Sequence, residues 1–222
     1  MKKDYLRSWC DQAWLYVLYA IGIIMLIVLF INWGTWDEAH RVTCILAVLL
    51  PIHVFEENTL PGGFYYRNNA SVGSAQPLVY PQSMLTNMIT NLGAEIVILL
   101  LMIPASHWEY SIMTFIVVFV LGQVVSHTRG GVWAYRKYKE NGKKTIYDPG
   151  LFTSYIGLLE LAIYAFWWLL QRPFQLGSFL GGFGIMILIG GGLIGLPFAI
   201  STRVKSQRFA FEDAGYFQKF LR

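Results

Sequence analysis

Three ionisable side chains, His53, Glu56 and Glu57, stand close together inside an apolar stretch of the sequence. At about 100° per residue in a helix, Glu56 lies about 60° to one side of His53 and Glu57 about 40° to the other. All three therefore share one face. Two adjacent carboxylates repel, so one should be protonated unless a cation lies beside them. Imidazole with carboxylate suits zinc first, with iron or manganese as alternatives.

Two other apolar stretches carry polar side chains spaced by four residues, and a third carries a single carboxyl group. These side chains are Asn87, Asn91 and Glu95, then Gln123 and His127, and finally Glu160. Residues four apart lie on one helix face, so each spaced set forms a polar stripe. Ionisable groups in a bilayer are costly and usually functional, whereas a lone Asn or Gln usually forms an interhelical hydrogen bond.

The composition predicts that these residues are held by membrane-spanning helices. Of the 222 residues, 55% are apolar and only 14% are charged, against roughly 25% in soluble domains. Six stretches approach the roughly 20 residues that cross a bilayer as a helix. They are residues 13–31, 42–58, 84–103, 111–127, 151–170 and 179–200. We therefore expect an all-α, polytopic transmembrane bundle forming a single membrane-embedded domain over residues 1–222.

The basic residues indicate the orientation of this bundle. With both termini in the cytoplasm, only Arg41 and Arg172 fall outside, and the other 15 of the 17 Lys and Arg residues fall inside. These are Lys2, Lys3, Arg7, Arg67, Arg129, Arg136, Lys137, Lys139, Lys143, Lys144, Arg203, Lys205, Arg208, Lys219 and Arg222. The positive-inside rule thus supports six helices with both termini in the cytoplasm. Charges spread in this way do not indicate nucleic-acid binding.

This orientation brings the polar stripes to a common depth. The stretch 42–58 runs inward, so His53 to Glu57 lie in its cytoplasmic third; Asn87 and Asn91 begin the next helix at that level, and His127 ends the following one. Glu95 and Glu160 fall nearer the midplane, as an inner shell. His40 and His107 fall on the opposite side of the membrane and are excluded as ligands of the same site.

The two cysteines should not pair. Cys10 precedes the first span inside and Cys44 begins the second outside, so a hydrocarbon core of about 30 Å separates them. The first apolar run is too long for a signal peptide and has no cleavage site, so we interpret it as a retained helix.

Two segments have an open role. The loop at residues 61–81 is long and rich in Gly, Asn, Ser and Pro, which suits a lid, a re-entrant segment or a flexible connector. The last span is rich in glycine. Its pairs Gly177/Gly181 and Gly191/Gly195 favour close helix packing, within the bundle or in a homo-oligomer. A broken helix at residues 190–192 lining a cavity is the alternative.

The segment Pro51-Ile52-His53-Val54-Phe55-Glu56-Glu57-Asn58 resembles the HXXEE family of small multi-helix membrane proteins. A later helix-borne histidine and a Tyr-Asn-Pro-Gly-like turn would correspond to His127 and to Tyr147-Asp148-Pro149-Gly150, with Asp in place of Asn. The resemblance implies a membrane enzyme that uses His53, Glu56 and Glu57.

Other membrane enzymes fit less well. Intramembrane CAAX-type proteases follow their Glu pair with Arg at a fixed spacing, whereas Asn58-Thr59-Leu60-Pro61 follows the pair in this chain. Membrane di-iron hydroxylases use eight or more histidines, and this chain has 4. No Gly-rich phosphate loop or G-x-S-x-G elbow occurs.

We therefore expect a metal-assisted hydrolase of the bacterial plasma membrane, acting on a lipid or other amphipathic substrate at the cytoplasmic side. His53, His127 and Glu57 or Glu56 would hold the metal, and the other glutamate would be the general acid or base. Asn87, Asn91, Glu95, Gln123 and Glu160 would orient ligands or substrate. The alternative is a transporter that relays protons or a cation through the same groups. A non-catalytic scaffold built on the Gly-rich last span is a third.

Overall fold

The computed structural model describes residues 4–221 and is all-helical over that range, without strands. Within it, six segments are long and apolar enough to cross a membrane: Tyr5–Asn32, Glu38–Asn58, Met84–Leu101, Glu109–Tyr138, Leu151–Leu170 and Leu176–Val204. The predicted number and order of spans are confirmed, so the chain has the architecture of a multi-pass membrane protein. Lys2, Lys3 and Arg222, counted above as inside charges, lie outside the described residues.

Two of the spans contain a π-helical turn, a third is interrupted by a kink at Ile156 and Gly157, and the other three are regular α-helices. The regular spans are α3 (Glu38–Asn58), α5 (Met84–Leu101) and α6 (Glu109–Tyr138). The others run from α1 (Tyr5–Ser8) through Trp9–Ala13 to α2 (Trp14–Asn32), from α7 (Leu151–Thr153) through Ser154–Leu158 to α8 (Leu159–Leu170), and from α9 (Leu176–Ile187) through Leu188–Gly195 to α10 (Leu196–Val204). Outside them lie α4 (Phe64–Ser71) and 3-10 turns at Ala105–His107, Lys139–Asn141, Gln207–Phe209 and Gly215–Phe220.

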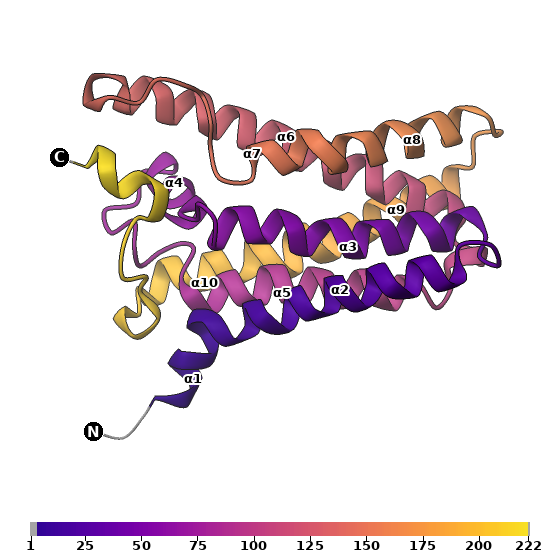
Figure 1. Ribbon diagram of the computed structural model, residues 1–222, viewed down its shortest axis with the longest axis horizontal. Coiled ribbons are helices and arrows are strands. Elements are labelled where there is room, and N and C mark those ends of the chain that lie inside the picture. Colours follow the sequence, from indigo (N-terminus) through magenta and orange to yellow (C-terminus); the bar gives the residue numbers. More distant parts are fainter. Residues whose placement is uncertain (1–3, 222) are drawn as a thin grey trace.

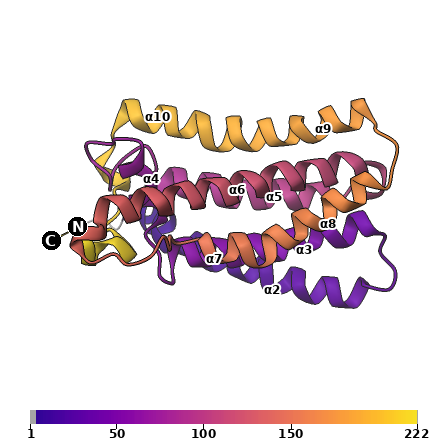
Figure 2. The same cartoon turned by 90° about the horizontal axis from the view of Figure 1, so that it is seen from above.

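The spans lie alongside one another, and both ends of the chain meet at the same end of the bundle (Figure 1). Arg208 donates to the carboxylate of Asp4 at 2.8 Å from two nitrogens, which ties these ends together. Seen from above, α9 and α10 run along one side of the bundle and α2 along the opposite side (Figure 2). An even number of crossings places the two ends of the chain on the same side of the membrane. The assignment of that side to the cytoplasm stays a prediction.

Local capping signals explain where two spans begin. Asp37 precedes α3 and accepts a hydrogen bond from the backbone N–H of His40 at 2.9 Å. Ser83 and Thr86 form a capping box at the start of α5. Such residues satisfy the N–H groups that a helix leaves unpaired in its first turn. The second span therefore starts at Glu38 rather than at residue 42.

The predicted end of the fourth span at residue 127 is wrong, because α6 continues to Tyr138. Gly130 and Gly131 do not break the helix. Their lack of a side chain lets the Arg67 guanidinium and the Ile146 carbonyl approach the helix surface closely. His127 therefore lies inside a long helix rather than at its last turn.

The extension of α6 belongs to a second apolar cluster, which we call the terminal cap. Its buried members are Tyr65, Tyr66, Ala70, Ala134, Tyr138, Ala214, Phe217 and Phe220. They come from α4, from α6 and from the C-terminal segment. Asn69 is fully buried in the loop at 61–81 and exchanges hydrogen bonds of 2.7–2.8 Å with the backbone of Pro77 and Gln82. This loop is therefore a packed element containing α4, and not a flexible connector.

The glycines of the last span behave differently from one another. Gly181 and Gly182 pack against Ser111 and Thr114 of α6, where an added Cβ would lie 2.6–2.8 Å from the nearest atoms. By contrast, a Cβ at Gly177 would meet nothing within 4 Å, and one at Gly191 or Gly195 would meet only atoms of its own span. The span is not broken at 190–192 but winds as a π-helix. A homo-oligomer through these glycines stays a prediction.

Cys10 and Cys44 are both buried and free. The prediction that they do not form a disulfide is confirmed.

The orientation can be tested with reporter fusions. A periplasmic reporter such as alkaline phosphatase should be active when fused after Arg172, and a cytoplasmic reporter should be active when fused to the C-terminus. The charge distribution gives this expectation, because the predicted topology assigns 15 of the 17 basic residues to one side of the membrane. The inverse pattern would reverse the orientation, and equal activity at both positions would contradict the six-span topology.

Candidate metal centre

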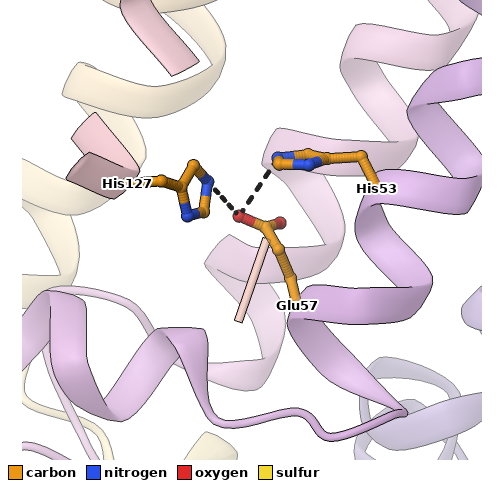
Figure 3. A group of neighbouring side chains, drawn as sticks. All are labelled: His53, Glu57 and His127. Carbon is orange, nitrogen blue, oxygen red and sulfur yellow. Dashed lines mark ion pairs between the residues drawn. The ribbon is translucent and has the colours of Figure 1, made fainter. Parts of the chain in front are cut away.

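Helix α3 places His53 and Glu57 one turn apart, and α6 places His127 against them. Atom Oε1 of Glu57 lies 3.5 Å from Nε2 of His53 and 3.2 Å from Nε2 of His127. Figure 3 shows both rings beside this one carboxylate group. All three side chains are buried, with exposed fractions of 1% for His53, 4% for Glu57 and 0% for His127. The structure thus brings together the three residues predicted as metal ligands.

The second nitrogen of each imidazole ring faces a polar side chain of the segment after α6. Nδ1 of His53 lies 2.8 Å from Oγ1 of Thr153, and Nδ1 of His127 lies 3.4 Å from Oδ2 of Asp148. Ligating histidines in metalloproteins usually engage a carboxylate or another polar group through the far ring nitrogen, which fixes the ring orientation. This arrangement leaves both Nε2 atoms directed at Glu57.

Asp148 is itself held by a buried arginine. Arg67 of α4 donates from Nε to both carboxylate oxygens at 3.0 Å and from Nη2 to Oδ2 at 2.6 Å. Its exposed fraction is 2%. Arg67, counted above among the inside charges, is therefore also an ion-pair partner inside the protein. A bidentate guanidinium–carboxylate pair is geometrically specific, so it fixes Asp148 against His127.

Gly150 is required by the position of His127. It adopts φ of +92°, and a Cβ at this position would overlap the imidazole ring of His127. Lys143 secures the same turn by donating from Nζ to the carbonyl of Tyr147 at 2.6 Å. Burial lowers the pKa of this lysine to about 8. The turn before α7 therefore packs directly against the imidazole ring of His127.

Glu56 has a different environment from Glu57. Its carboxylate accepts from the Tyr147 hydroxyl at 2.9 Å, from the backbone N–H of Phe152 and Thr153 at 3.2 and 2.8 Å, and from the Thr153 hydroxyl at 2.6 Å. Burial and the neighbouring Glu56 raise the pKa of Tyr147, which keeps its hydroxyl a donor. The two glutamates expected to act together in one site therefore have separate partners. Consecutive helical residues diverge by about 100°, which separates the two carboxylates.

Two of the amide side chains predicted to surround the site lie at a cavity of about 280 Å³ that His53 and Glu57 also line; they are Asn91 and Gln123. Asn87 lies behind them. Its Oδ1 accepts from Asn91 at 2.9 Å, and its Nδ2 donates to Asn58 at 2.6 Å. Asn87 therefore orients Asn91 rather than facing the cavity.

The two carboxyl groups predicted as an inner shell do not join the site. Glu160 is exposed and accepts from the backbone N–H of Gly157, at the kink of the fifth span. It sits on the side of the bundle where α8 faces the start of α3, near Glu38 and Arg41. Glu95 is fully buried, and neither of its carboxyl oxygens has a hydrogen-bond partner. Neither side chain lines the cavity at His53. Glu95 lies one turn beyond Asn91 on α5, and Glu160 lies beside a different cavity.

The donor atoms fit a metal ion. One ligand atom from each of His53, Glu57 and His127 can be chosen so that all three lie within 4.8 Å of one another. Ligands of a tetrahedral zinc ion with bonds of 2.0–2.1 Å are separated by about 3.3 Å, and the two Nε2–Oε1 distances of 3.5 and 3.2 Å lie on either side of this value. Neither Nε2 atom has a hydrogen-bond partner beyond its ion-pair contact with Glu57, although both are buried, and Nδ1 of His127 has none either. Buried imidazole nitrogens are ordinarily paired, so a cation would satisfy them.

His40 and His107 lie at the other end of the bundle, as predicted. His40 begins α3 and bonds through Nδ1 to Asp37 at 2.9 Å, while His107 lies in the 3-10 turn between α5 and α6. Neither can reach His53.

The sequence patterns missed two residues of the site and left the role of a third open. Nothing in the sequence marks Thr153, because its contact with His53 depends on how the preceding turn folds. Arg67 is the only basic residue in a long polar loop, and a lone charge in such a loop can indicate a buried ion pair. Asp148 was noted only for its place before a span and in the turn motif, without its contact to His127.

The fold and the cluster define the class of protein. It is a six-span membrane protein with a buried His-Glu-His cluster at one end of the bundle. Residues 44–165, just over half of the chain, match a family described as proteins of unknown function with an HXXEE motif. The chain belongs to this HXXEE family. The match contains the motif, His127 and the 147–150 turn. Comparison with curated proteins and with solved structures gives no match.

The contact between Gly150 and His127 can be tested with a matched pair of substitutions. Gly142 also has φ of +92°, but a Cβ there would meet nothing within 4 Å. Gly142→Ala should therefore cost about 1 kcal/mol of stability from backbone strain alone. Gly150→Ala should cost about 1–3 kcal/mol more, because the histidine ring must move. Unfolding in mixed detergent micelles measures both, and equal losses would contradict the contact.

Proposed function

We propose that this protein is a metal-dependent membrane hydrolase that acts on a lipid or other amphipathic substrate. The observation that carries the proposal is the convergence of His53, Glu57 and His127, three donors of the right chemistry, beside a cavity. Zinc is the first choice for two imidazoles and a carboxylate, and iron or manganese are alternatives.

The number of protein ligands favours catalysis over a structural role. Structural zinc sites are closed by four protein ligands, whereas catalytic sites use three and leave a position for water or substrate. Here two imidazoles and one carboxylate would hold the ion, and His53 and Glu57 also line the cavity. A bound divalent metal would supply an activated water and polarise a carbonyl or phosphoryl oxygen.

The surrounding residues have distinct roles in this proposal. Thr153 and Asp148 orient the two imidazoles, and Arg67 keeps Asp148 in place. Asn91 and Gln123 present amide groups to the cavity, where they could bind polar atoms of a substrate. Glu56, with its carboxylate hydrogen-bonded to the start of α7, acts as a positioning residue for Thr153 and not as the general base.

The depth of the cluster suits an amphipathic substrate. His53 and Glu57 occupy the last two turns of α3, just below the terminal cap. The charge distribution predicts that this end is cytoplasmic. A scissile bond near the headgroup level of a lipid would lie at the same depth.

A transporter that uses the same cluster is the second candidate, because Glu95 provides a further buried carboxyl group deeper in α5. Buried ionisable groups at two depths are typical of proton pathways. However, the outer half of the bundle between them and the far surface is filled by apolar side chains, among them Leu46, Ile98, Ile112, Met113 and Ile116. This packing favours the hydrolase.

Metal analysis of the purified protein tests the proposal directly. Wild-type protein should retain about one divalent ion per chain, and His53→Ala and His127→Ala should lose it. His40→Ala and His107→Ala serve as matched controls and should retain it, since both residues lie at the other end of the bundle. Elemental analysis by mass spectrometry gives the stoichiometry. The proposal would be refuted if the wild-type protein contained no metal after zinc, iron and manganese had been supplied. It would also be refuted if His53→Ala kept its full metal content.

The two glutamates should respond differently to the same change. Glu57→Gln removes the only charged ligand and should abolish metal binding, whereas Glu56→Gln should weaken it by about 10–100-fold, as loss of a supporting contact does. Titration with zinc in the presence of a competing chelator measures both. Equal loss in the two variants would mean that Glu56 is itself a ligand.

A further inference from the structure

The cavity beside the metal centre has a polar part and an apolar part. It is bounded by α3, α4, α5, α6 and the last span. Toward the terminal cap it is lined by the amides of Asn68 and Gln82, and at the level of the histidines by those of Asn91 and Gln123. The buried Nε2 of His53, which has no hydrogen-bond partner, belongs to a residue of this lining. The polar part therefore offers neutral hydrogen-bonding groups next to the proposed metal.

The cavity continues toward the middle of the membrane between apolar side chains. Leu50 lies one turn before His53 on α3, and Phe119 lies eight residues before His127 on α6, which is about 12 Å along the helix. Ile189, Ile194 and Phe198 of the last span form the facing wall. A volume of about 280 Å³ lies at the lower end of the range for ligand pockets and suits part of one hydrocarbon chain.

The lining carries no positive charge. Among the described residues that line the cavity, Glu57 is the only acidic one and none is Lys or Arg. The guanidinium of Arg67, on the neighbouring α4, is already neutralised by both oxygens of Asp148. An ionised phosphate placed here would lose its hydration without gaining a cationic partner other than the metal, which is unfavourable. Asn68, Gln82 and Asn91 already form a hydrogen-bonded row through Asn87. A neutral carbonyl, hydroxyl or amide group would be matched by Gln123 and by the amide atoms of this row that remain available.

The last span provides a way in from the membrane. In the most apolar 18-residue stretch of this span, only 11% of the residues are buried, against 61% in α3. Helix α10 has no buried residue. Facing it, Gly122 and Ser126 of α6 line the cavity and are exposed. The π-helical turn at Leu188–Gly195 carries Ile189 and Ile194 to the cavity, and its Leu193 carbonyl accepts from Thr90 of α5 at 3.0 Å. Such turns occur frequently at functional sites.

We infer that the substrate is an uncharged lipid ester or amide, whose single acyl chain enters the cavity between α6 and the last span. This inference rests on the proposed function and specifies its substrate class. The carbonyl group lies at the amide-lined end beside His53 and Glu57, and the acyl chain lies along Leu50, Phe119 and Ile189.

The reaction is hydrolysis of the acyl bond. The oxygen of water forms a bond to the acyl carbon, and the C–O or C–N bond to the headgroup breaks. One proton of the water ends on the leaving oxygen or nitrogen, and the other remains with the carboxylic acid product. No oxidant or reductant is needed.

Photocrosslinking with two matched probes tests the substrate class. One probe is a monoacylglycerol with a diazirine at the end of its acyl chain, and the other is the lysophosphatidic acid with the same chain. In maltoside micelles, the neutral probe should label peptides containing Phe119 or Ile189 at least about tenfold more than the phosphate probe. Equal labelling by both probes, or stronger labelling by the phosphate probe, would overturn the inference.

Two glycine substitutions provide a control for the location. A Cβ at Gly122 or at Gly184 would meet nothing within 4 Å, but only Gly122 lines the cavity. Gly122→Phe should reduce labelling by about tenfold or more and keep the metal, whereas Gly184→Phe should keep both within about twofold. Equal labelling in the two variants would overturn the inference.

Metal content, measured on the same samples, separates the two proposals. Metal-bound protein that shows no preference for the neutral probe would contradict the substrate class alone. Metal-free protein that still labels with the neutral probe in the cavity would contradict the proposed hydrolase and leave the lipid site standing.

Discussion

The burial of one carboxylate, Glu57, between two imidazoles inside a helix bundle is the constraint on which the rest of this structure depends. A charge removed from water costs several kcal/mol unless it is paired, and the cost is greater when no solvent can reach it. Glu57 is paired with His53 and His127 at 3.5 and 3.2 Å. Displacing either imidazole would leave the buried Glu57 carboxylate with one partner fewer and so raise the cost of burying its charge. The residues around both rings must therefore hold them in place.

A series of contacts from the connecting segments holds the imidazole of His127 in place. Arg67 binds Asp148, Asp148 faces His127, and His127 faces Glu57. The first two of these residues come from connecting segments rather than from spans. This explains why the loop at 61–81 is folded against α6, and why Gly130 and Gly150 have no room for a side chain. The terminal cap therefore forms one unit with the cluster of His53, Glu57 and His127, although it is separate in sequence.

The spans and three site residues could be predicted because helical phase, hydropathy and charge each give an independent constraint on the same positions. His53, Glu57 and His127 met at one depth for this reason. Glu56 and Glu160 were misassigned because the phase of a residue within its helix does not say which neighbouring element its side chain meets. Both carboxylates accept a hydrogen bond from a backbone N–H group, that of Thr153 for Glu56 and that of Gly157 for Glu160. Arg67 and Thr153 depend on how connecting segments fold, which periodicity does not describe.

The π-helical turn at Leu188–Gly195 also sets the angular register of everything that follows it. If the same residues wound as a regular α-helix, α10 would be rotated relative to α9 by about 100° for each extra residue that the π-helical turn now accommodates. Ile194 and Phe198 would then face lipid instead of the cavity wall that they now form. The winding of this glycine segment is therefore as much a part of the site as the identity of its polar residues, and a change that made it a regular α-helix would alter the cavity wall without altering any polar residue.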